Sequence, residues 1–253
     1  MQLTVLGRWS PYPAPGGACP SYLIQEGRTR VMLDCGPGAV ARLRQHCEAH
    51  DLSALVLSHL HVDHILSIYS LRDAYEWQRV DPERPPLPVY APDDAAELLV
   101  AILRGPESAA RFRSTLAFHP ITEASLVSVG PLRLTFARTQ HPVYCLAVRI
   151  ECAGRTLVYS ADSSPTPALD VLARGANLLL CEATFPDSHA AFAAQVGHMT
   201  ATQAAELAAR AGAERLVLTH FAPQFDPEEQ RRAAAKILHT RAQIAEENAH
   251  YPI

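Results

Sequence analysis

The sequence predicts an α/β fold in which β-sheets are covered by helices. Strand-like runs alternate with stretches of helical periodicity along the whole chain. The second half has the same order of strands followed by helices as the first, although no repeat is visible in the sequence. No linker is long enough to separate independent domains. Residues 1–253 are therefore expected to form one domain, and 253 residues are ample for a sizeable core.

The first half of the chain is expected to begin with strands. Apolar runs of strand character lie at 3–7, 21–27, 29–36, 52–59 and 89–91. Helical periodicity covers 38–50, 64–79 and 93–104. Glu26-Gly27-Arg28 is typical of a hairpin turn between the second and third strands. The proline-rich segment DPERPPLP (81–88) is expected to be a loop.

The second half alternates strands and turns before it becomes helical. Further strands are expected at 126–130, 132–138, 144–151, 156–162, 177–183 and 215–220. The alanine-rich stretch TATQAAELAARAG (200–212) predicts a helix with Thr200 as N-cap and Gly212 at its end. A last helix is expected from Pro227.

The composition is that of a globular protein without a strong charge field. Hydrophobic residues make up 48% of the chain and charged residues 19%, and the formal charge is −4 with a pI near 6.3. A protein that grips long nucleic acid usually has a basic field, so no long nucleic acid partner is expected. The chain has no run of 18 apolar residues and begins with a strand-like segment, so no membrane association is expected.

The cysteines are scattered and form no CxxC pair. There are six of them, Cys19, Cys35, Cys47, Cys145, Cys152 and Cys181. They are expected to be reduced and mostly buried residues of a cytoplasmic protein, because a disulfide framework would show regular spacing in a small secreted chain.

Residues 58–64 read SHLHVDH and follow the apolar run ALVL directly. Histidine is a common zinc ligand, and a side chain at the end of a buried strand is held rigidly with its tip exposed. In extended backbone His59 and His61 project to the same side, so both imidazoles can reach one ion. Asp63 and His64 come two positions later and can reach a neighbouring ion. The cluster predicts a metal site; the simpler alternative is a set of surface histidines in a loop.

One cluster does not complete two sites, and three further candidates end strand-like runs. His141 follows LTFARTQ, Asp162 follows TLVYSA and His220 follows RLVLT. A carboxylate can bridge two cations and an imidazole cannot, so Asp162 is assigned as the bridging ligand. The expected sets are His59, His61 and His141 for one metal and Asp63, His64 and His220 for the other. Two divalent ions are expected, zinc first, since such ligands also suit manganese and iron.

With these residues assigned, the chain resembles the metallo-β-lactamase superfamily. The resemblance rests on HLHVDH (59–64), His141, SADSS (160–164) and LTHF (218–221), and it extends to LTVLG and LDCGPGA (33–39). It implies a four-layer αβ/βα metallo-β-lactamase sandwich with a two-metal site along one edge of the sheets. Asp34 matches an acidic residue that is structural and near the site in the family. A turn-forming aspartate beside Gly36 explains it equally well.

Two further stretches, CEATF (181–185) and GHMTATQAA (197–205), bear on the reaction. His198 is expected just before a helix N-terminus, which favours an anion, and it could donate a proton to a leaving alkoxide. Glu182 could hold that imidazole oriented and charged. Taken singly, His198 could be a helix cap and Glu182 a charge at a strand end. Together with LTHF these stretches resemble the ribonuclease Z-like phosphodiesterase branch, which implies that His198 is the acid–base histidine and Glu182 its partner.

The chain departs from the tRNA-processing enzymes of that branch in one place. Only 20 residues separate His141 from Asp162, whereas those enzymes insert there a long arm that grips the tRNA. A small cyclic or nucleotide phosphodiester is therefore the expected substrate, rather than a tRNA 3′ end. A metal-bridged hydroxide is the expected nucleophile, with Asp63 as its orienting base and His198 as general acid.

Other functions remain open at this point. A carboxylic-ester, lactone or thioester hydrolase could use the same metals and would not need His198. A non-catalytic binding module would be free to lose ligands, and none is missing here. The branch implies a homodimer. Arg104, Arg111 and Arg113 could contribute to a lid over the site or belong to a solvated helix face.

Overall fold

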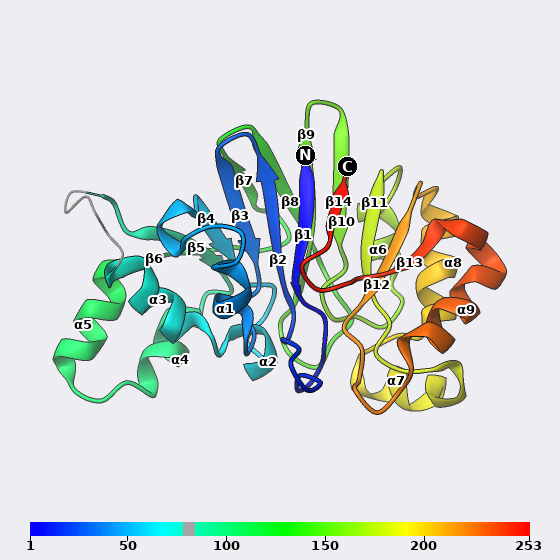
Figure 1. Ribbon diagram of the computed structural model, residues 1–253, viewed down its shortest axis with the longest axis horizontal. Helices are drawn as coiled ribbons and strands as arrows, with labels where there is room; N and C mark the ends of the chain where they lie inside the picture. The colour runs from blue at the N-terminus through cyan, green and yellow to red at the C-terminus, as the bar shows by residue number, and fades with distance from the viewer. Residues whose placement is uncertain (78–83) are drawn as a thin grey trace.

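The computed structural model describes residues 1–77 and 84–253. Two seven-stranded sheets lie face to face, and helices cover the outer side of each sheet (Figure 1). The predicted four-layer αβ/βα sandwich is therefore confirmed.

The first sheet has the strand order β14-β1-β2-β3-β4-β5-β6. Its strands are β1 (Gln2–Gly7), β2 (Ser21–Glu26), β3 (Thr29–Leu33), β4 (Ala54–Val56), β5 (Leu87–Ala91), β6 (Leu116–Pro120) and β14 (His250–Pro252). From β14 to β3 neighbouring strands are antiparallel, and from β3 to β6 they are parallel. The expected hairpin joins β2 to β3, and Gly27 has the positive φ of 56° that its turn requires.

The second sheet is built in the same way, in the order β13-β12-β11-β10-β9-β8-β7. Its strands are β7 (Leu126–Val129), β8 (Leu132–Arg138), β9 (Leu146–Cys152), β10 (Arg155–Tyr159), β11 (Leu178–Glu182), β12 (Leu216–Thr219) and β13 (Ala242–Ile244). Strands β7 to β10 are antiparallel and β10 to β13 are parallel. The similar order of the two halves of the sequence is thus a similarity between the two sheets.

Three apolar layers hold the sandwich together. One core lies between the sheets, and each outer core lies between a sheet and its helices. The first sheet is covered by α1 (Ala39–Leu43), α3 (Ile68–Trp77), α4 (Ala95–Ala101) and α5 (Pro106–Thr115), and the second by α6 (Pro167–Leu172), α8 (Ala201–Ala211) and α9 (Pro227–Leu238). Helix α8 begins at the predicted N-cap, where the Thr200 hydroxyl accepts a hydrogen bond from the Gln203 N–H, and it ends at Gly212. The short helices α2 (Val62–Ile65) and α7 (Ala190–Val196) lie at the lower edge of the sandwich in Figure 1.

Several predicted boundaries were wrong. The stretch 38–50 forms only the short α1 and a 3-10 turn at Ala49–Asp51, because Glu48 and Asp51 cap that turn instead of continuing the helix. The periodicity over 64–79 is divided between α2 and α3, and residues 78 and 79 lie outside the described residues. Of the loop expected at 81–88, residues 81–83 are also outside the description, and 87 and 88 belong to β5. Helices α5, α6 and α7 and strands β6, β13 and β14 were not expected.

None of the helices in the described ranges is long and apolar enough to cross a membrane. All six cysteines are free thiols, and burial raises the pKa of the Cys47 thiol to about 11.

Candidate metal centre and acid–base pair

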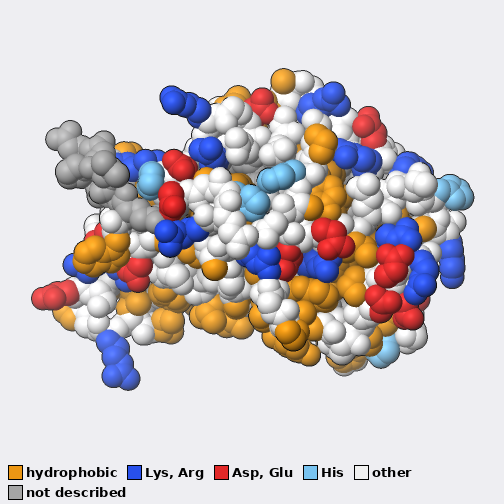
Figure 2. Space-filling model, viewed as in Figure 1, with side chains coloured by type: hydrophobic (Ala, Val, Ile, Leu, Met, Phe, Trp, Pro, Cys, Tyr) orange, Lys and Arg blue, Asp and Glu red, His pale blue; other side chains and the backbone are white. Residues whose placement is uncertain are grey.

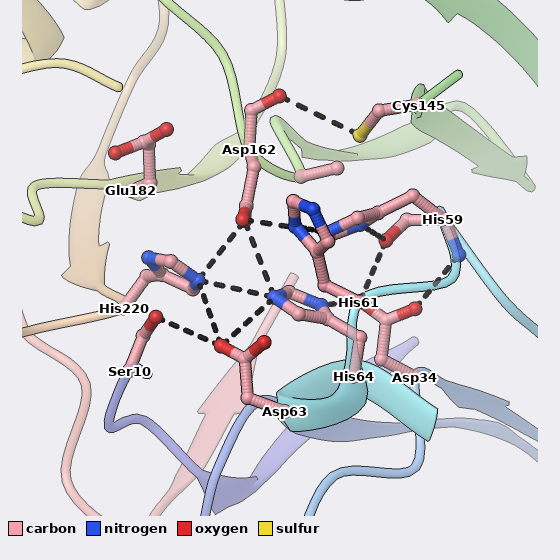
Figure 3. Close-up of polar contacts among 12 residues, drawn as sticks. Ser10, Asp34, His59, His61, Asp63, His64, Cys145, Asp162, Glu182 and His220 are labelled. Carbon is pink, nitrogen blue, oxygen red and sulfur yellow. Dashed lines mark hydrogen bonds and ion pairs between the residues drawn. The ribbon is translucent and has the colours of Figure 1, made fainter. Parts of the chain in front are cut away.

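All of the predicted ligands lie at one edge of the two sheets. Figure 3 labels each of them except His141. The segment from His59 to His64 follows β4, His141 follows β8, Asp162 follows β10 and His220 follows β12. These strands end at the same edge, so their next residues meet although up to 161 positions separate them in the sequence. Residues from both halves of the chain therefore build one site.

The first cluster is formed by His59, His61, His141 and Asp162. His61 Nδ1 lies 3.1 Å from both His59 Nε2 and His141 Nε2. Tetrahedral zinc with bonds of about 2.0–2.1 Å separates its nitrogen ligands by roughly 3.3 Å, so this spacing fits one ion.

The second cluster is formed by Asp63, His64 and His220. His64 Nε2 and His220 Nε2 are 3.1 Å apart, and the Oδ2 atom of Asp63 lies 3.7 and 3.8 Å from them. The same three groups can therefore surround a second ion.

Asp162 faces both clusters with different oxygens. Its Oδ2 lies 3.5 Å from His59 Nε2, and its Oδ1 lies 3.0 Å from His220 Nε2 and 3.4 Å from His64 Nε2. Oδ1 is buried, and no donor reaches it with the direction that a hydrogen bond requires. His220 Nε2 is close enough only for an ion pair. A buried carboxylate oxygen without a hydrogen bond is costly unless a cation binds it, so the donor set fits two bridged divalent ions.

Asp34 fixes His64 from behind. The buried carboxylate accepts hydrogen bonds from His64 Nδ1 at 2.8 Å, from the Tyr159 hydroxyl at 2.8 Å, and from the backbone N–H and hydroxyl of Ser58 at 2.7 and 2.9 Å. A carboxylate only accepts, so His64 must carry its proton on Nδ1 and keeps Nε2 free for a cation. Asp34 therefore supports the site directly, which favours the expectation from the resemblance over a mere turn residue.

The other candidate ligands are held by similar contacts. Nδ1 of His59 lies 3.0 Å from the Ser58 hydroxyl, and Nδ1 of His141 lies 3.0 Å from the carbonyl of Gly197. His220 Nδ1 lies 2.8 Å from the Thr184 hydroxyl. Each contact leaves Nε2 of its histidine directed at the clusters, so the arrangement is set before a cation arrives.

The electrostatics of the metal-free site differ between the two clusters. Burial lowers the pKa of His59 well below its usual value, and it also lowers the pKa of His61 and His141. These imidazoles are therefore neutral, which is the form that binds metal. Burial opposes charge on His64 as well, but attraction to Asp162 and Asp34 raises its pKa well above the usual value. The metal-free imidazole therefore carries a second proton on Nε2, which a cation that enters the second cluster must displace, while the proton on Nδ1 stays bonded to Asp34.

His198 and Glu182 form a separate pair beside the clusters. Nδ1 of His198 lies 3.0 Å from an oxygen of the fully buried Glu182, and its ring is stacked 5.3 Å from the ring of His220. Burial opposes the charge, but the attraction of Glu182 and its hydrogen bond raise the pKa of His198 to about 9. The helix cap is Thr200, so His198 is not a cap residue.

Glu182 is more than a charge at a strand end. It accepts hydrogen bonds from the backbone N–H groups of Ser163 and Met199 and from the Thr184 hydroxyl. Because the Thr184 hydroxyl donates to Glu182, it accepts from His220. Glu182 thus orients His198 directly and a candidate ligand through Thr184.

Ser10 belongs to the site and was missed in the sequence. Its hydroxyl donates to Oδ2 of Asp63 at 2.8 Å, the oxygen that faces His64 and His220. A parallel bridge between Trp9 and Phe221, next to His220, brings Ser10 there. No local motif marks such a serine.

The backbone at the site is unusual. Asp34, Ala161 and His220 have positive φ angles of 55°, 50° and 62° at the ends of their strands, a region that non-glycine residues rarely adopt. Gly36 allows a close approach, since a Cβ there would lie 2.0 Å from the carbonyl oxygen of Asp63. The turns that place the candidate ligands are therefore specifically shaped.

A cavity of about 400 Å³ opens over the clusters. It is lined by Ser10, Pro11, Leu60, His61, Val62, Asp63, Asp162 and His198. The arginines considered for a lid do not line it: Arg111 pairs with Glu76 and Arg113 with Glu97, on the outer helices. The cavity suits a small molecule.

Comparisons with known proteins agree with the fold. Residues 29–221 match the family described as the β-lactamase superfamily domain. YhfI of Bacillus subtilis, named as a probable metallo-hydrolase, is 33% identical over 93% of both chains, and its crystal structure aligns over 99% of both chains with a TM-score of 0.88. Ribonuclease Z of Mycolicibacterium paratuberculosis is 32% identical over 93% of this chain and 91% of its own. The short form of human tRNase Z shares the fold, with a TM-score of 0.82 at 20% identity over 100% and 99% of the two chains.

Proposed function

The chain belongs to the β-lactamase superfamily as a metal-dependent hydrolase of its ribonuclease Z-like branch, and we propose that it is a phosphodiesterase for small phosphodiesters. The observation that supports this most is the His198–Glu182 pair beside the two clusters. A diester needs a proton for its leaving alkoxide, and a buried imidazolium held by a carboxylate can supply it. The proposal treats residues 1–253 as one hydrolase domain in the cytoplasm.

The ligand sets proposed are those whose atoms converge. His59, His61 and His141 would hold one ion, Asp63, His64 and His220 the other, and Asp162 would bridge them. When bound, two divalent ions would activate water as a nucleophile and stabilise charge on the phosphoryl oxygens. Five imidazoles and two carboxylates suit zinc, so zinc is the metal proposed first, with manganese and iron as the alternatives.

The chain's own residues would supply the remaining steps. Asp63, held by Ser10, would orient the attacking water. Glu182 holds His198 by Nδ1, which leaves Nε2 free to give its proton to the departing oxygen. In the metal-free site the pair with Glu182 raises the pKa of His198 to about 9, so this proton is in place there at neutral pH.

A small substrate is favoured by the segment between His141 and Asp162. It contains only β9 and β10, joined as a hairpin within the second sheet. No other segment lies between these two residues that could reach for the body of a tRNA. The small phosphodiester stays the proposed partner, and a homodimer stays a prediction.

A second candidate is tRNA 3′ processing, favoured by the 32% identity with proteins named ribonuclease Z. This candidate predicts cleavage of a precursor tRNA at least as efficient as cleavage of a small diester. The two functions therefore differ in a measurable ratio of kcat/KM values.

The test is the hydrolysis of bis(p-nitrophenyl) phosphate by the zinc-loaded protein, beside p-nitrophenyl acetate and a precursor tRNA. We expect diester cleavage. With a cyclic nucleotide, whose leaving group is an alkoxide, His198→Ala should lower kcat on the order of a hundredfold or more, and the loss should be smaller with bis(p-nitrophenyl) phosphate, because p-nitrophenolate leaves without a proton. His189→Ala is the matched control, since His189 is an exposed histidine nine positions away. Ester turnover alone would instead assign the site to ester or lactone hydrolysis, and unimpaired diester cleavage by His198→Ala would show that His198 is not the general acid.

A further inference from the structure

We propose that Pro11, Leu60 and Val62 form an apolar wall that binds one uncharged, apolar alcohol group of the phosphodiester. The preferred substrate would then be a monoanionic diester with an apolar arm, not a molecule with several phosphates. This inference rests on the phosphodiesterase function proposed above.

The composition of the cavity lining is the first observation. Five of the eight lining residues are candidate ligands, His198 and Ser10, and the remaining three are Pro11, Leu60 and Val62. Leu60 and Val62 are the spacer residues of HLHVDH, so each is a direct chain neighbour of candidate ligands. A group that contacts them therefore lies next to the position where a phosphorus atom would be attacked.

The exposure of these side chains is the second observation. Val62 is 64% exposed, and Leu66, one helical turn later, is 47% exposed. Tyr12, next to Pro11, is 52% exposed. Figure 2 shows a band of hydrophobic side chains along the lower edge of the molecule, where α2 and the loop after β1 lie in Figure 1. A cluster of large, solvent-exposed apolar side chains at the rim of a cavity is typical of a binding surface.

The distribution of charge is the third observation. Within residues 1–77 and 84–253, no lysine or arginine lines this cavity. Arg8 begins the loop after β1, and Arg42 donates to the carbonyl of Gly16 in that loop; these two arginines already pair with Glu246 and Glu247. His198 is already paired with the carboxylate of Glu182, which lies 3.0 Å from its Nδ1. A single phosphate over the ligand clusters would thus contact the cations bound there, whereas a second or third phosphate would meet no free cationic side chain of the described lining.

Binding of dialkyl phosphates tests the wall directly, because their alkoxide leaving groups make them far slower to cleave than bis(p-nitrophenyl) phosphate. Phosphorus NMR after each titration checks that they are still intact. Isothermal titration calorimetry of the zinc-loaded protein would compare dimethyl, diethyl and dibutyl phosphate. Each fully buried methylene is worth up to about fourfold in affinity, and partial burial of one butyl chain should give a gain on the order of tenfold from dimethyl to dibutyl phosphate.

The variant Val62→Ser should reduce this gain to less than about threefold, with a zinc content equal to that of the wild type. Val171→Ser is the matched control, since Val171 is 63% exposed but lies on α6. It should keep the full gain.

The outcomes separate the wall from the proposed function. Turnover of bis(p-nitrophenyl) phosphate together with equal affinity for all three dialkyl phosphates would overturn the wall and leave the phosphodiesterase standing. Absence of any diester turnover would overturn both. Sedimentation of the wild type and of Val62→Asp completes the test: a dimer that only this variant dissociates would assign the apolar residues to a subunit interface and contradict the proposal.

Discussion

Replacing Asp34 with asparagine should weaken one metal site more than the other. Oδ1 of Asp34 accepts from the backbone of Ser58, and Oδ2 accepts from His64, Tyr159 and the Ser58 hydroxyl. Asparagine can keep the first contact, but it places an NH₂ group where Oδ2 stood. His64 then meets a donor, and to satisfy it must move its proton to Nε2, the nitrogen that faces the second cluster.

The size of the effect follows from these contacts. The Tyr159 and Ser58 hydroxyls can rotate to accept, so the loss in unfolding free energy should be about 1–3 kcal/mol. Loss of the contact that orients a ligand typically costs 10–100-fold in metal affinity, or about 1.4–2.8 kcal/mol. His64 should show this cost in full, whereas His59 depends on Asp34 only through Ser58 and should show less.

Competition for zinc with a chromogenic chelator resolves the two affinities. We expect the weaker site of Asp34→Asn to lose 10–100-fold and the other site distinctly less. Asp170→Asn is the control, because Asp170 forms only an exposed pair with Arg210 on the outer helices. Two affinities within twofold of the wild type, in a variant with a native circular dichroism spectrum, would refute the reasoning. An equal loss at both sites would show that Asp34 acts through the fold as a whole.

Further predictions concern Ser10, the His198–Glu182 pair and the removal of zinc. Ser10→Ala should lower kcat about tenfold with little change in KM, because Asp63 loses its hydrogen bond donor, and a changed KM alone would contradict this. In the metal-free protein, NMR should find His198 protonated until the pH passes about 9, and Glu182→Gln should lower that pKa, since removing the carboxylate removes the group that raises it. Because the folded-state pKa is raised, this pair stabilises the protein fully below about pH 6.5 and loses its effect as the pH rises through 9. Removing zinc with a chelator should lower Tm, and re-addition of zinc in excess should restore it.

The fold was predictable where local patterns are strong. Helix α8 has an apolar face at regular spacing, a threonine cap and a terminal glycine, and its limits were predicted within one residue at each end. Strands β13 and β14 are three residues each and gain their identity only by pairing with β12 and β1. Such short edge strands have no pattern of their own, which explains why they were missed. In the region of α1, helical periodicity continues in the sequence to residue 50. The capping box of Glu48 and Asp51 begins a separate 3-10 turn there instead of continuing the helix.

The positions of most candidate ligands were predictable because these residues follow a strand, and Asp63 and His64 come in α2 directly after His61. A buried apolar run that stops at a histidine or aspartate places that side chain at a sheet edge, so each of His59, His141, Asp162 and His220 could be found one by one. The sequence could not show which oxygen of a carboxylate, or which nitrogen of an imidazole, faces a cluster. Asp162 directs one oxygen to each cluster, and Asp34 fixes the proton on His64. Both arrangements depend on turns with positive φ angles, which residue types alone do not reveal.

Ser10 shows where such prediction fails for a physical reason. The loop that presents it has no regular structure and is held by distant parts of the chain: the N–H of Ser10 donates to the carbonyl of Phe221, and the N–H of Ala18 donates to Glu247. These partners are more than 200 positions away, so no window of sequence around residue 10 contains the information. The serine that supports Asp63 is therefore determined by the closure of the whole sandwich, in which the segment after β12 and the C-terminal segment both pack against the loop after β1. A substitution at Glu247, which ligates nothing, should then reach the site through that loop and lower kcat by the same route as Ser10→Ala.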